Sequence, residues 1–231
     1  MSVDVVSPPR ADSGASAGVP QLSIISPAYN ERANIRPLVA AVAAAMGGTR
    51  WELIVVDDDS PDGTAEEVFA IAGEGYPVRC IRRIGRRGLA SAVVEGALAA
   101  NAAVIAVIDA DLQHDEKLLP AMLALIAAGD SDLVVGSRHV DGGGVGDWSK
   151  DRQAMSSFAT WCANLALGTG ISDPMSGFFA IRRDVFHASV HDLSQQGYKI
   201  LLDIISSAPH ALRITEIPYV FRNRTQGESK V

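Results

Sequence analysis

The chain has 231 residues, 48% of them hydrophobic, so it is long and apolar enough for one sizeable domain with a buried core. Its formal net charge of -7 excludes a general nucleic-acid binder, because such a protein needs an excess of Lys and Arg to meet phosphates. The two cysteines, Cys80 and Cys162, lie far apart and form no metal-binding spacing. Each lies in an apolar stretch, so we expect two buried, reduced thiols, as in a cytosolic protein.

The N-terminal segment, residues 1–20, lacks the basic start and apolar core of a secretory signal, and we expect it to be a disordered tail. The remainder, residues 21–231, contains no linker and is expected to form a single domain. Its longest uncharged run, residues 153–172, has about the length needed to cross a bilayer. Because this run contains several Ser, Thr and Asn residues, we interpret it as a buried or interfacial helix.

From Leu22 onward, short apolar runs alternate with stretches of helical periodicity. Strands are expected at 22–26, 52–57, 78–83, 103–109 and 132–137, with helices between them at 31–46, 64–72, 89–99 and 116–128. This alternation predicts an α/β fold with a mostly parallel central sheet flanked by helices. Beyond Ser137 we expect a mobile Gly-rich loop at 139–150, a helix, a turn at 172–176, a strand at 177–183, a helix at 199–207, and strands at 211–217 and 218–223.

Polar clusters follow four of the predicted strands. The clusters are PAYNE (27–31), DDDSPDGT (57–64), DADLQH (109–114) and GSR (136–138). The carboxyl ends of parallel strands meet at one edge of a sheet, where open α/β sheets bind their ligands. The second cluster alone could equally cap a helix through Asp59, Ser60 and Asp62, but four clusters at one edge favour a binding site.

The DADLQ segment carries the sharpest signal. Asp109, Asp111 and Gln113 alternate, so they share one face if the strand extends that far. Two neighbouring carboxylates repel one another unless a cation lies between them, and oxygen ligands suit Mg²⁺ or Mn²⁺. The alternative is a solvated loop with spare acids. His114 is expected to shape this loop rather than to bind the metal, because a hard cation prefers oxygen.

Together these motifs resemble the inverting glycosyltransferase family 2, and within it the dolichol-phosphate (polyprenyl-phosphate) mannosyltransferase group. The resemblance rests on PAYNERANI, VVDDDSPDGT, R-x-G-L-x-x-A-x-x-x-G (86–96), DADLQH, VVGSR, SDPMSGFFAIRR, GYKILLDI and EIPYVFRNRTQGESK. It implies a GT-A type fold, with a nucleotide and metal half at about 21–137 and an acceptor half at about 138–231.

The resemblance also implies roles for individual residues. Those implied for nucleotide-sugar binding are Pro27, Tyr29, Glu31, Asp57, Asp58 and Asp109. Those implied for the metal are Asp109, Asp111 and Gln113. Those implied for the acceptor phosphate are Arg138, Arg152, Ser156, Lys199 and Arg224, with Asp111, Arg138 and Arg152 as the catalytic set. Gln226 stands where similar sequences often carry a basic residue, and Arg222 is a candidate substitute, whereas Arg182 and Arg183 are expected on a solvated surface.

The implied reaction is metal-dependent, inverting transfer of a hexose, mannose from GDP-mannose, to a polyprenyl phosphate. A phosphate acceptor is largely dianionic at neutral pH and needs no general base, and the chain lacks the Q-x-x-R-W box of polysaccharide-building members. The alternatives are glucose from UDP-glucose, a hydroxyl acceptor on the same fold, and a non-catalytic nucleotide-sugar-binding protein. A nucleotidyltransferase is disfavoured, because PAYNE is not a Gly-rich loop with a lysine.

The acceptor implied by this resemblance remains in a bilayer, so the membrane surface is an expected partner. We expect a cytoplasmic protein attached weakly and peripherally through Trp148, Lys150 and Arg152, the apolar helix after them, and the basic C-terminal residues. Similar proteins often continue past G-E-S-K into a membrane-binding tail. The chain is therefore expected either to use a membrane-anchoring protein partner or to lack its original tail.

Overall fold

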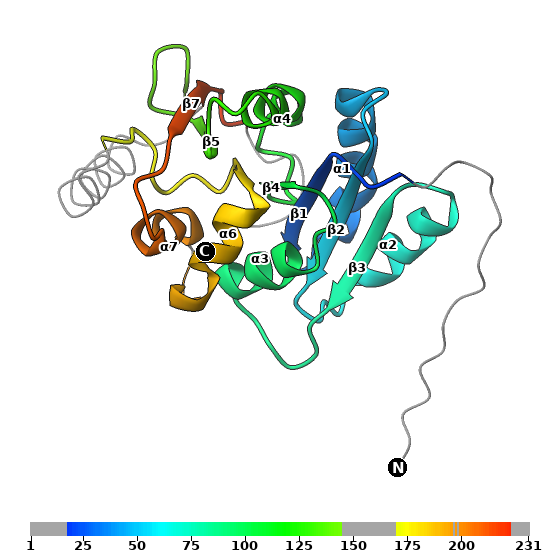
Figure 1. Cartoon of the computed structure of the whole chain (residues 1–231). Coiled ribbons are helices and arrows are strands. Elements are labelled where there is room, and N and C mark those ends of the chain that lie inside the picture. The colour runs from blue at the N-terminus through cyan, green and yellow to red at the C-terminus, as the bar shows by residue number, and fades with distance from the viewer. Residues whose placement is uncertain (1–17, 145–169, 196, 198, 223–231) are drawn as a thin grey trace.

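A computed structural model of the chain describes residues 18–144, 170–195, 197 and 199–222. Its centre is a seven-stranded sheet in the order β3-β2-β1-β4-β6-β5-β7 (Figure 1). The strands are β1 (Leu22–Ala28), β2 (Trp51–Asp57), β3 (Val78–Arg82), β4 (Val104–Val107), β5 (Leu133–Ser137), β6 (Phe179–Arg182) and β7 (Ile214–Pro218). Only β6 runs antiparallel to its neighbours, β4 and β5. The predicted α/β fold with a mostly parallel sheet is confirmed.

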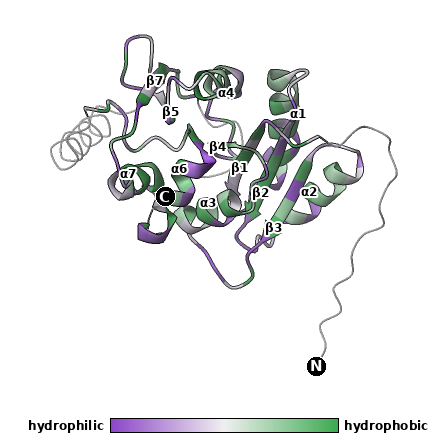
Figure 2. Ribbon diagram, viewed as in Figure 1, coloured by the Kyte–Doolittle hydropathy of each residue, from purple (hydrophilic) through white to green (hydrophobic). Residues whose placement is uncertain are grey.

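The sheet is buried on both faces, as its continuous apolar strands predict. Ile24 of β1 packs into a core on one face, and the next residue, Ile25, packs into a core on the other. Leu53 and Ile54 of β2 divide between the two cores in the same way. Figure 2 shows the strands at the centre of the sheet as mainly hydrophobic, with hydrophilic residues in the loops and at intervals along the flanking helices.

Helices cover each face of this sheet. The first core lies under α1 (Arg32–Met46), α2 (Thr64–Gly73) and α4 (Leu119–Ala127). The second lies under α3 (Leu89–Leu98), α6 (Arg183–Ser189) and α7 (Ile200–Ser207). Figure 1 shows α3, α6 and α7 grouped on the near side. Two short 3-10 helices, η1 (Glu116–Leu118) and η2 (Val190–Asp192), complete the described elements.

Gly96 sets how closely α3 approaches the sheet. A Cβ atom at this position would lie 2.4 Å from Ile25 Cγ2 and 2.9 Å from Val56 Cγ2, both in the sheet beneath. Because those side chains are fully buried, they have no space into which to move. The glycine that ends the R-x-G-L-x-x-A-x-x-x-G pattern is therefore required by packing.

Several predicted elements differ from the structure in their bounds or their kind, among them the following three. The fourth strand ends at Val107 rather than at residue 109, because the N–H of Asp109 donates to His114 Nδ1 (3.2 Å) instead of to a neighbouring strand. The helix predicted at 116–128 is divided into η1 and α4, because Pro120 at the start of α4 has no N–H to continue the first turn. The strand predicted at 218–223 is not found in its described part: residues 219–222 form only a single bridge there, between Val220 and Gly144.

Helix α6 has no counterpart among the predicted elements, although the strand before it does. Other expectations are tested only in part. Cys80 is half-buried rather than buried, and Cys162 lies outside the described residues. Residues 139–144 of the predicted mobile loop form a turn, with the N–H of Gly143 donating to the carbonyl of Val140 (2.8 Å), while the helix expected after the loop lies outside the described residues. Among the described helices, none has the length and hydrophobicity needed to cross a bilayer.

Candidate active site

The four predicted polar clusters follow strands whose carboxyl ends lie at the same edge of the sheet. Strands β1, β2 and β4 are mutually parallel, and β5 has the same direction because it and β4 are both antiparallel to β6. The clusters after Ala28, Asp57, Val107 and Ser137 are therefore brought to one rim. This rim brings together polar side chains from four distant parts of the sequence.

The loop after β2 caps helix α1 as well as its own helix. Three hydrogen bonds run from the N–H of Asn30 to Ser60 Oγ (2.8 Å), from the N–H of Glu31 to Thr64 Oγ1 (3.0 Å), and from the N–H of Arg32 to Asp62 Oδ2 (3.1 Å). They satisfy N–H groups that have no partner within a helix. Asp62 therefore binds the first N–H of α1 and, through the N–H of Thr64 (3.0 Å), the first N–H of α2, whereas Ser60 binds the loop before α1; together they fix the loop after β1 relative to the loop after β2.

Asp57 and Asp58 are both buried at the end of β2. Burial raises the pKa of Asp57, although its carboxylate also accepts hydrogen bonds from the hydroxyl and the N–H of Ser60. Asp58 Oδ1 accepts from Arg83 Nε (2.7 Å), and Asp58 Oδ2 accepts from the N–H of Gly88 (2.8 Å). The carboxylate predicted to bind a nucleotide thus also holds the loop between β3 and α3.

Arg83 is the first residue of that loop, and its side chain is only 1% exposed. Besides Asp58, it donates to Ser91 Oγ (2.7 Å), to Glu95 Oε1 (3.2 Å) and to the carbonyl of Gly88 (2.9 Å). A buried charge of this kind persists only where its hydrogen bonds are satisfied. Arg83 thereby fixes the β3–α3 loop against the end of β2.

Two of the other predicted nucleotide-binding residues also have partners at this rim. The guanidinium of Arg87, from the β3–α3 loop, lies 4.1 Å from the centre of the Tyr29 ring, a cation–π contact. Glu31 is buried, and its Oε2 accepts a hydrogen bond from Asn34 Nδ2 (2.6 Å). Pro27 lies in β1, in register with Val56 of β2. The six predicted nucleotide-binding residues thus follow or end three adjacent strands.

The predicted metal-binding segment is a loop rather than a strand, so alternation does not place its side chains on one face. Leu112 has a left-handed backbone (φ 64), which lets Asp111 Oδ1 accept a hydrogen bond from the N–H of Gln113 (3.1 Å). The Asp109 carboxylate lies against the backbone of Gly177, where a Cβ would be 3.2 Å from its Oδ2. The loop therefore reaches the segment that leads into β6.

His114 is buried beneath this loop. Its ring stacks on Phe178 at 5.2 Å between centroids and contacts the rings of Tyr219 and Phe221 edge-on at 5.7 Å. Burial, with the positive charge of Arg138 as a further cause, lowers the pKa of His114 to about 3. Because Nδ1 accepts from the Asp109 N–H, the neutral ring carries its proton on Nε2, which lies 3.7 Å from Asp109 Oδ2.

This burial predicts that stability falls in mild acid. An unfolded histidine takes up a proton near pH 6.5, whereas His114 stays neutral until about pH 3, so the unfolded state binds more protons between those values. Stability is therefore lost as the pH falls below 6.5, by roughly 1 kcal/mol per pH unit from this residue. Urea unfolding of the protein and of His114→Gln at several pH values measures the difference in slope.

The matched control is His187→Gln, which changes an exposed histidine on the opposite face of the molecule. We expect the acid sensitivity to persist in the control and to be reduced in His114→Gln. Equal slopes in the two variants would mean that His114 does not stay neutral in the folded protein.

Arg138, which follows β5, makes a bidentate ion pair with Asp173. Its Nε and Nη2 donate to Asp173 Oδ2 and Oδ1, each at 2.7 Å, and its backbone N–H donates to Oδ2 at 3.1 Å. The guanidinium lies 5.7 Å from the centre of the Phe221 ring. Since Phe221 also contacts His114, the arginine lies next to the metal-binding loop.

The segment after β7 binds the same loop. The N–H of Arg222 donates to the carbonyl of Gln113 (2.9 Å), and Gln113 Nε2 donates to the carbonyl of Arg222 (3.0 Å). The Arg222 guanidinium pairs with Glu116 (2.7 Å) and with Asp115. These acids occupy the arginine, so the suggestion that Arg222 substitutes in a phosphate-binding set is not supported.

Of the remaining residues predicted to bind the acceptor phosphate, the structure describes only Lys199. Lys199 precedes α7 with an exposed side chain, which makes no hydrogen bond or ion pair with the described residues. Arg152, Ser156 and Arg224 lie outside the described residues. Arg182 and Arg183 are partly exposed and bind elsewhere: Arg182 pairs with Asp184 and Asp132, and Arg183 donates to the carbonyls of residues 100 and 101.

The chemistry of the loop suits a hard divalent cation. Asp109, Asp111 and Gln113 supply carboxylate and amide oxygens, and the hydrogen bond from Gln113 Nε2 to Arg222 orients that amide. The described residues contain no group of three or more His, Cys, Asp and Glu side chains arranged to hold a metal. Two carboxylates and one amide leave coordination to be completed by other oxygens, such as those of a diphosphate.

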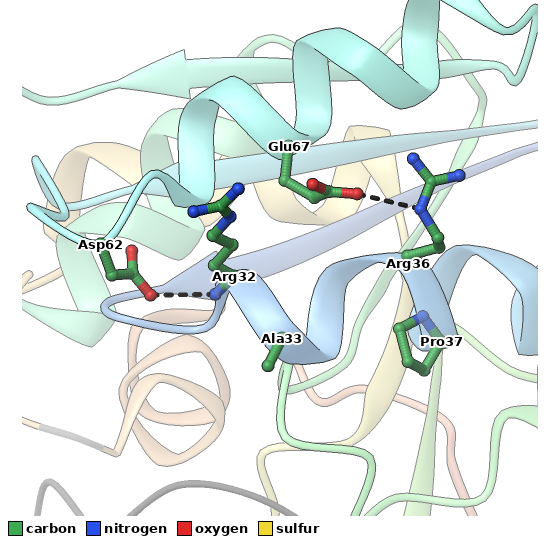
Figure 3. A pocket seen from close by; sticks show the side chains of 6 residues that line it. All are labelled: Arg32, Ala33, Arg36, Pro37, Asp62 and Glu67. Carbon is green, nitrogen blue, oxygen red and sulfur yellow. Dashed lines mark hydrogen bonds and ion pairs between the residues drawn. The ribbon is translucent and has the colours of Figure 1, made fainter.

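A separate hollow of about 480 Å³ lies between the first turns of α1 and α2 (Figure 3). Its lining residues are Arg32, Ala33, Arg36, Pro37, Asp62 and Glu67. Arg36 there pairs with Glu67 (3.0 Å) and with Glu74 on the exposed surface. None of the six belongs to the predicted nucleotide or metal residues, so this hollow is not the candidate active site.

Sequence reasoning gave no role to several residues that organise the site. Arg83 resembles the end of an exposed edge strand, and its burial depends on Asp58, which is 25 positions away. Asp173 stands in the quoted SDPMSGFF motif, but no spacing indicated that it would pair with Arg138. Tyr219 and Phe221 were assigned to a strand, although they pack on His114.

Known proteins match most of the chain. The model of the family Glycosyl transferase family 2 matches residues 23–189. The dolichol-phosphate mannosyltransferase of Pyrococcus furiosus is 40% identical over 213 residues, which cover 91% of this chain and 59% of that protein. The Saccharomyces cerevisiae protein of the same name is 39% identical over 220 residues, covering 91% of this chain and 81% of that protein. The chain thus spans less than two thirds of the Pyrococcus relative.

Solved structures agree in fold. Glucosyl-3-phosphoglycerate synthase from Mycobacterium tuberculosis, in complex with Mn²⁺, UDP-glucose and phosphoglyceric acid, has a TM-score of 0.68 at 20% identity, covering 92% of this chain and 74% of that one. This similarity shows the GT-A type of fold expected from the sequence. The resemblance stated from the motifs is confirmed by the family match and by the relatives. The chain belongs to glycosyl transferase family 2.

Proposed function

We propose that this glycosyltransferase moves mannose from GDP-mannose to the phosphate of a polyprenyl phosphate, with inversion at the anomeric carbon. The observation that carries the proposal is the position of Arg138 beside the Asp109–Gln113 loop, since both contact His114 or its aromatic neighbours. This arrangement sets a cation for an anionic acceptor next to acids suited to a metal-bound diphosphate. Identity of about 40% to dolichol-phosphate mannosyltransferases supports the choice of sugar and acceptor.

In the proposed reaction, an oxygen of the acceptor phosphate attacks the anomeric carbon as the bond from that carbon to the diphosphate breaks. The acceptor needs no general base, because a phosphate monoester is largely dianionic at neutral pH. Arg138 offsets the repulsion between two anionic substrates. A divalent cation, Mg²⁺ or Mn²⁺, held by Asp109, Asp111 and Gln113 would neutralise charge on the leaving diphosphate.

We assign the other roles as follows. Residues 21–137 bind the nucleotide-sugar, through Pro27, Tyr29, Glu31, Asp57, Asp58 and Asp109. Residues 138–231 bind the acceptor, with Arg152, Ser156, Lys199 and Arg224 joining Arg138 at its phosphate. Because the lipid tail stays in the bilayer, the protein works peripherally at the cytoplasmic face of a membrane.

The test is an assay with the pure chain, radiolabelled GDP-mannose, and polyprenyl phosphate in phospholipid vesicles with Mg²⁺ or Mn²⁺. We expect label in the organic phase, loss of the signal with EDTA, and no transfer to the corresponding polyprenyl alcohol. Arg138→Ala is expected to weaken use of the acceptor more than binding of GDP, measured by calorimetry, because its partners lie beyond the nucleotide half.

Three outcomes would contradict parts of this proposal. Transfer from UDP-glucose in place of GDP-mannose would change the donor, and equal transfer to the alcohol would change the acceptor. Equal transfer to a short, water-soluble isoprenyl phosphate, with no flotation of the protein on vesicles, would remove the role of the membrane. The expected activity of the pure chain on vesicles does not contradict the proposal, but it would remove the need for a membrane-anchoring protein partner.

A further inference from the structure

The Arg138–Asp173 pair is asymmetric in its exposure. The Asp173 side chain is 1% exposed, whereas that of Arg138 is 12% exposed. Asp173 accepts three hydrogen bonds from Arg138, two from the guanidinium and one from the backbone N–H. One edge of the guanidinium is therefore fixed by a carboxylate that lies behind it, away from solvent.

Asp173 is itself held in place by a second acid. Glu216 accepts hydrogen bonds from the N–H of Ser172 (2.9 Å) and the N–H of Asp173 (3.1 Å). Glu216 lies in β7, in register with Val135 of β5, the strand that ends just before Arg138. The strands that carry Arg138 and Glu216 are thus neighbours, and the turn that carries Asp173 is fixed to both.

The backbone and the guanidinium of Arg138 are also constrained. A Cβ on Gly143 would lie 2.8 to 2.9 Å from backbone atoms of Ser137 and Arg138, so this glycine packs directly on the chain at Arg138. The Phe221 ring lies on the guanidinium at 5.7 Å. Burial alone would lower the pKa of Arg138, but the hydrogen-bonded Asp173 outweighs it and the pKa is raised, so the group stays charged.

We propose that Asp173 is a positioning residue that acts through Arg138, fixing the plane of the guanidinium so that its outer edge meets the acceptor phosphate. Glu216 supports Asp173 from behind. This inference rests on the proposed function, in which Arg138 meets that phosphate. Guanidinium groups bind phosphates in a planar, bidentate manner, so their orientation matters as much as their charge.

Charge and orientation predict opposite results for Asp173→Asn. Removing a negative charge behind Arg138 makes the site more positive, so an effect of charge alone would tighten acceptor binding and lower its KM. Loss of orientation raises that KM, because an asparagine amide cannot accept both guanidinium hydrogen bonds. We expect the acceptor KM to rise on the order of ten- to a hundredfold, with GDP affinity by calorimetry within about twofold.

The chain offers a closely matched control in Asp132. Its side chain is 8% exposed and accepts from Arg213 Nη2 (2.7 Å), Arg213 Nε (3.0 Å) and the Arg213 backbone N–H (3.0 Å), the same pattern as at Asp173. This pair lies at the opposite end of β5 from Arg138. Asp132→Asn is expected to lower the thermal midpoint while leaving the acceptor KM unchanged.

A double-mutant cycle tests whether Asp173 acts through Arg138. In an Arg138→Met background, Asp173→Asn is expected to cause no further rise in the acceptor KM, because the group that it positions is gone. The thermal midpoint of each variant is measured alongside, since Arg138→Met alone leaves a buried carboxylate unpaired. Glu216→Gln serves as a second variant if Asp173→Asn does not fold, and its acceptor KM is expected to rise to a smaller extent.

The outcomes separate the two proposals. An unchanged or lowered acceptor KM in Asp173→Asn, with the wild type active on polyprenyl phosphate, would overturn the positioning role and leave the proposed function in place. Independent effects of Asp173→Asn and Arg138→Met would also overturn it. Absence of transfer by the wild type would overturn both.

Discussion

Asp111→Asn is expected to lower turnover by on the order of a hundredfold or more while the protein remains folded. Asp111 is buried next to Leu112 in the loop predicted to bind the metal, and the variant loses one of its two carboxylates. The fold should survive, because an asparagine oxygen can still accept the hydrogen bond from the N–H of Gln113. Steady-state turnover at several Mn²⁺ concentrations and thermal unfolding measure the two effects.

Asp130→Asn is the control for this experiment. Asp130 is exposed before the start of β5, away from the metal-binding loop, and its substitution changes the net charge by the same amount as Asp111→Asn does. We expect its turnover to equal that of the wild type. If Asp111→Asn turned over at nearly the wild-type rate and still required metal, the assignment of Asp111 to the metal would be wrong.

Arg83→Met is expected to lower the free energy of unfolding by about 3 to 5 kcal/mol. The variant leaves the Asp58 carboxylate buried without its cation and removes the hydrogen bonds to Ser91, Glu95 and the carbonyl of Gly88. Urea unfolding followed by circular dichroism, with linear extrapolation, gives the difference in free energy.

Arg86→Met provides the comparison, since Arg86 lies in the same loop and also pairs with Glu95, but is 62% exposed. Exposed pairs contribute about 1 kcal/mol or less, so its stability should change little. Addition of Asp58→Asn to Arg83→Met should recover part of the loss. Similar free energies for Arg83→Met and Arg86→Met would show that the buried pair adds nothing to stability.

The order of strands and helices from Leu22 to Ser137 could be predicted, because each strand is buried on both faces and appears as a continuous apolar run. The insertion of β6 between β4 and β5 could not. It brings Phe179 opposite Val107 and Val135 by long-range pairing, and no local pattern specifies such a partner. The alternation of Tyr219, Val220 and Phe221 indicated a strand, but those side chains alternate between the His114 cluster and solvent, and among the described residues their backbone forms only the bridge to Gly144.

In the candidate site, too, local sequence patterns predicted some features, whereas others depend on contacts between residues far apart in the sequence. The rim could be predicted, because strand direction alone brings the four clusters together. The metal-binding loop was predicted from an alternation that its backbone does not have, since Leu112 turns left-handed between Asp111 and Gln113. The pairs that organise the rim, Asp58 with Arg83 and Arg138 with Asp173, join residues 25 and 35 positions apart and follow only from the folded chain.

The four residues after β7 have no regular secondary structure, yet their backbone joins the two loops of the site. The N–H of Tyr219 donates to the carbonyl of Ser137 (3.1 Å), that of Phe221 to Gly144 (2.9 Å), and that of Arg222 to Gln113 (2.9 Å). The separation between the loop that carries Arg138 and the loop that carries Asp111 is thus set by a fixed length of peptide and not by a hinge. A reaction between two anions that must approach in line tolerates little change in their spacing. An irregular segment of this kind is accordingly as strict in length as a strand, even though it forms none of the regular hydrogen bonding of one.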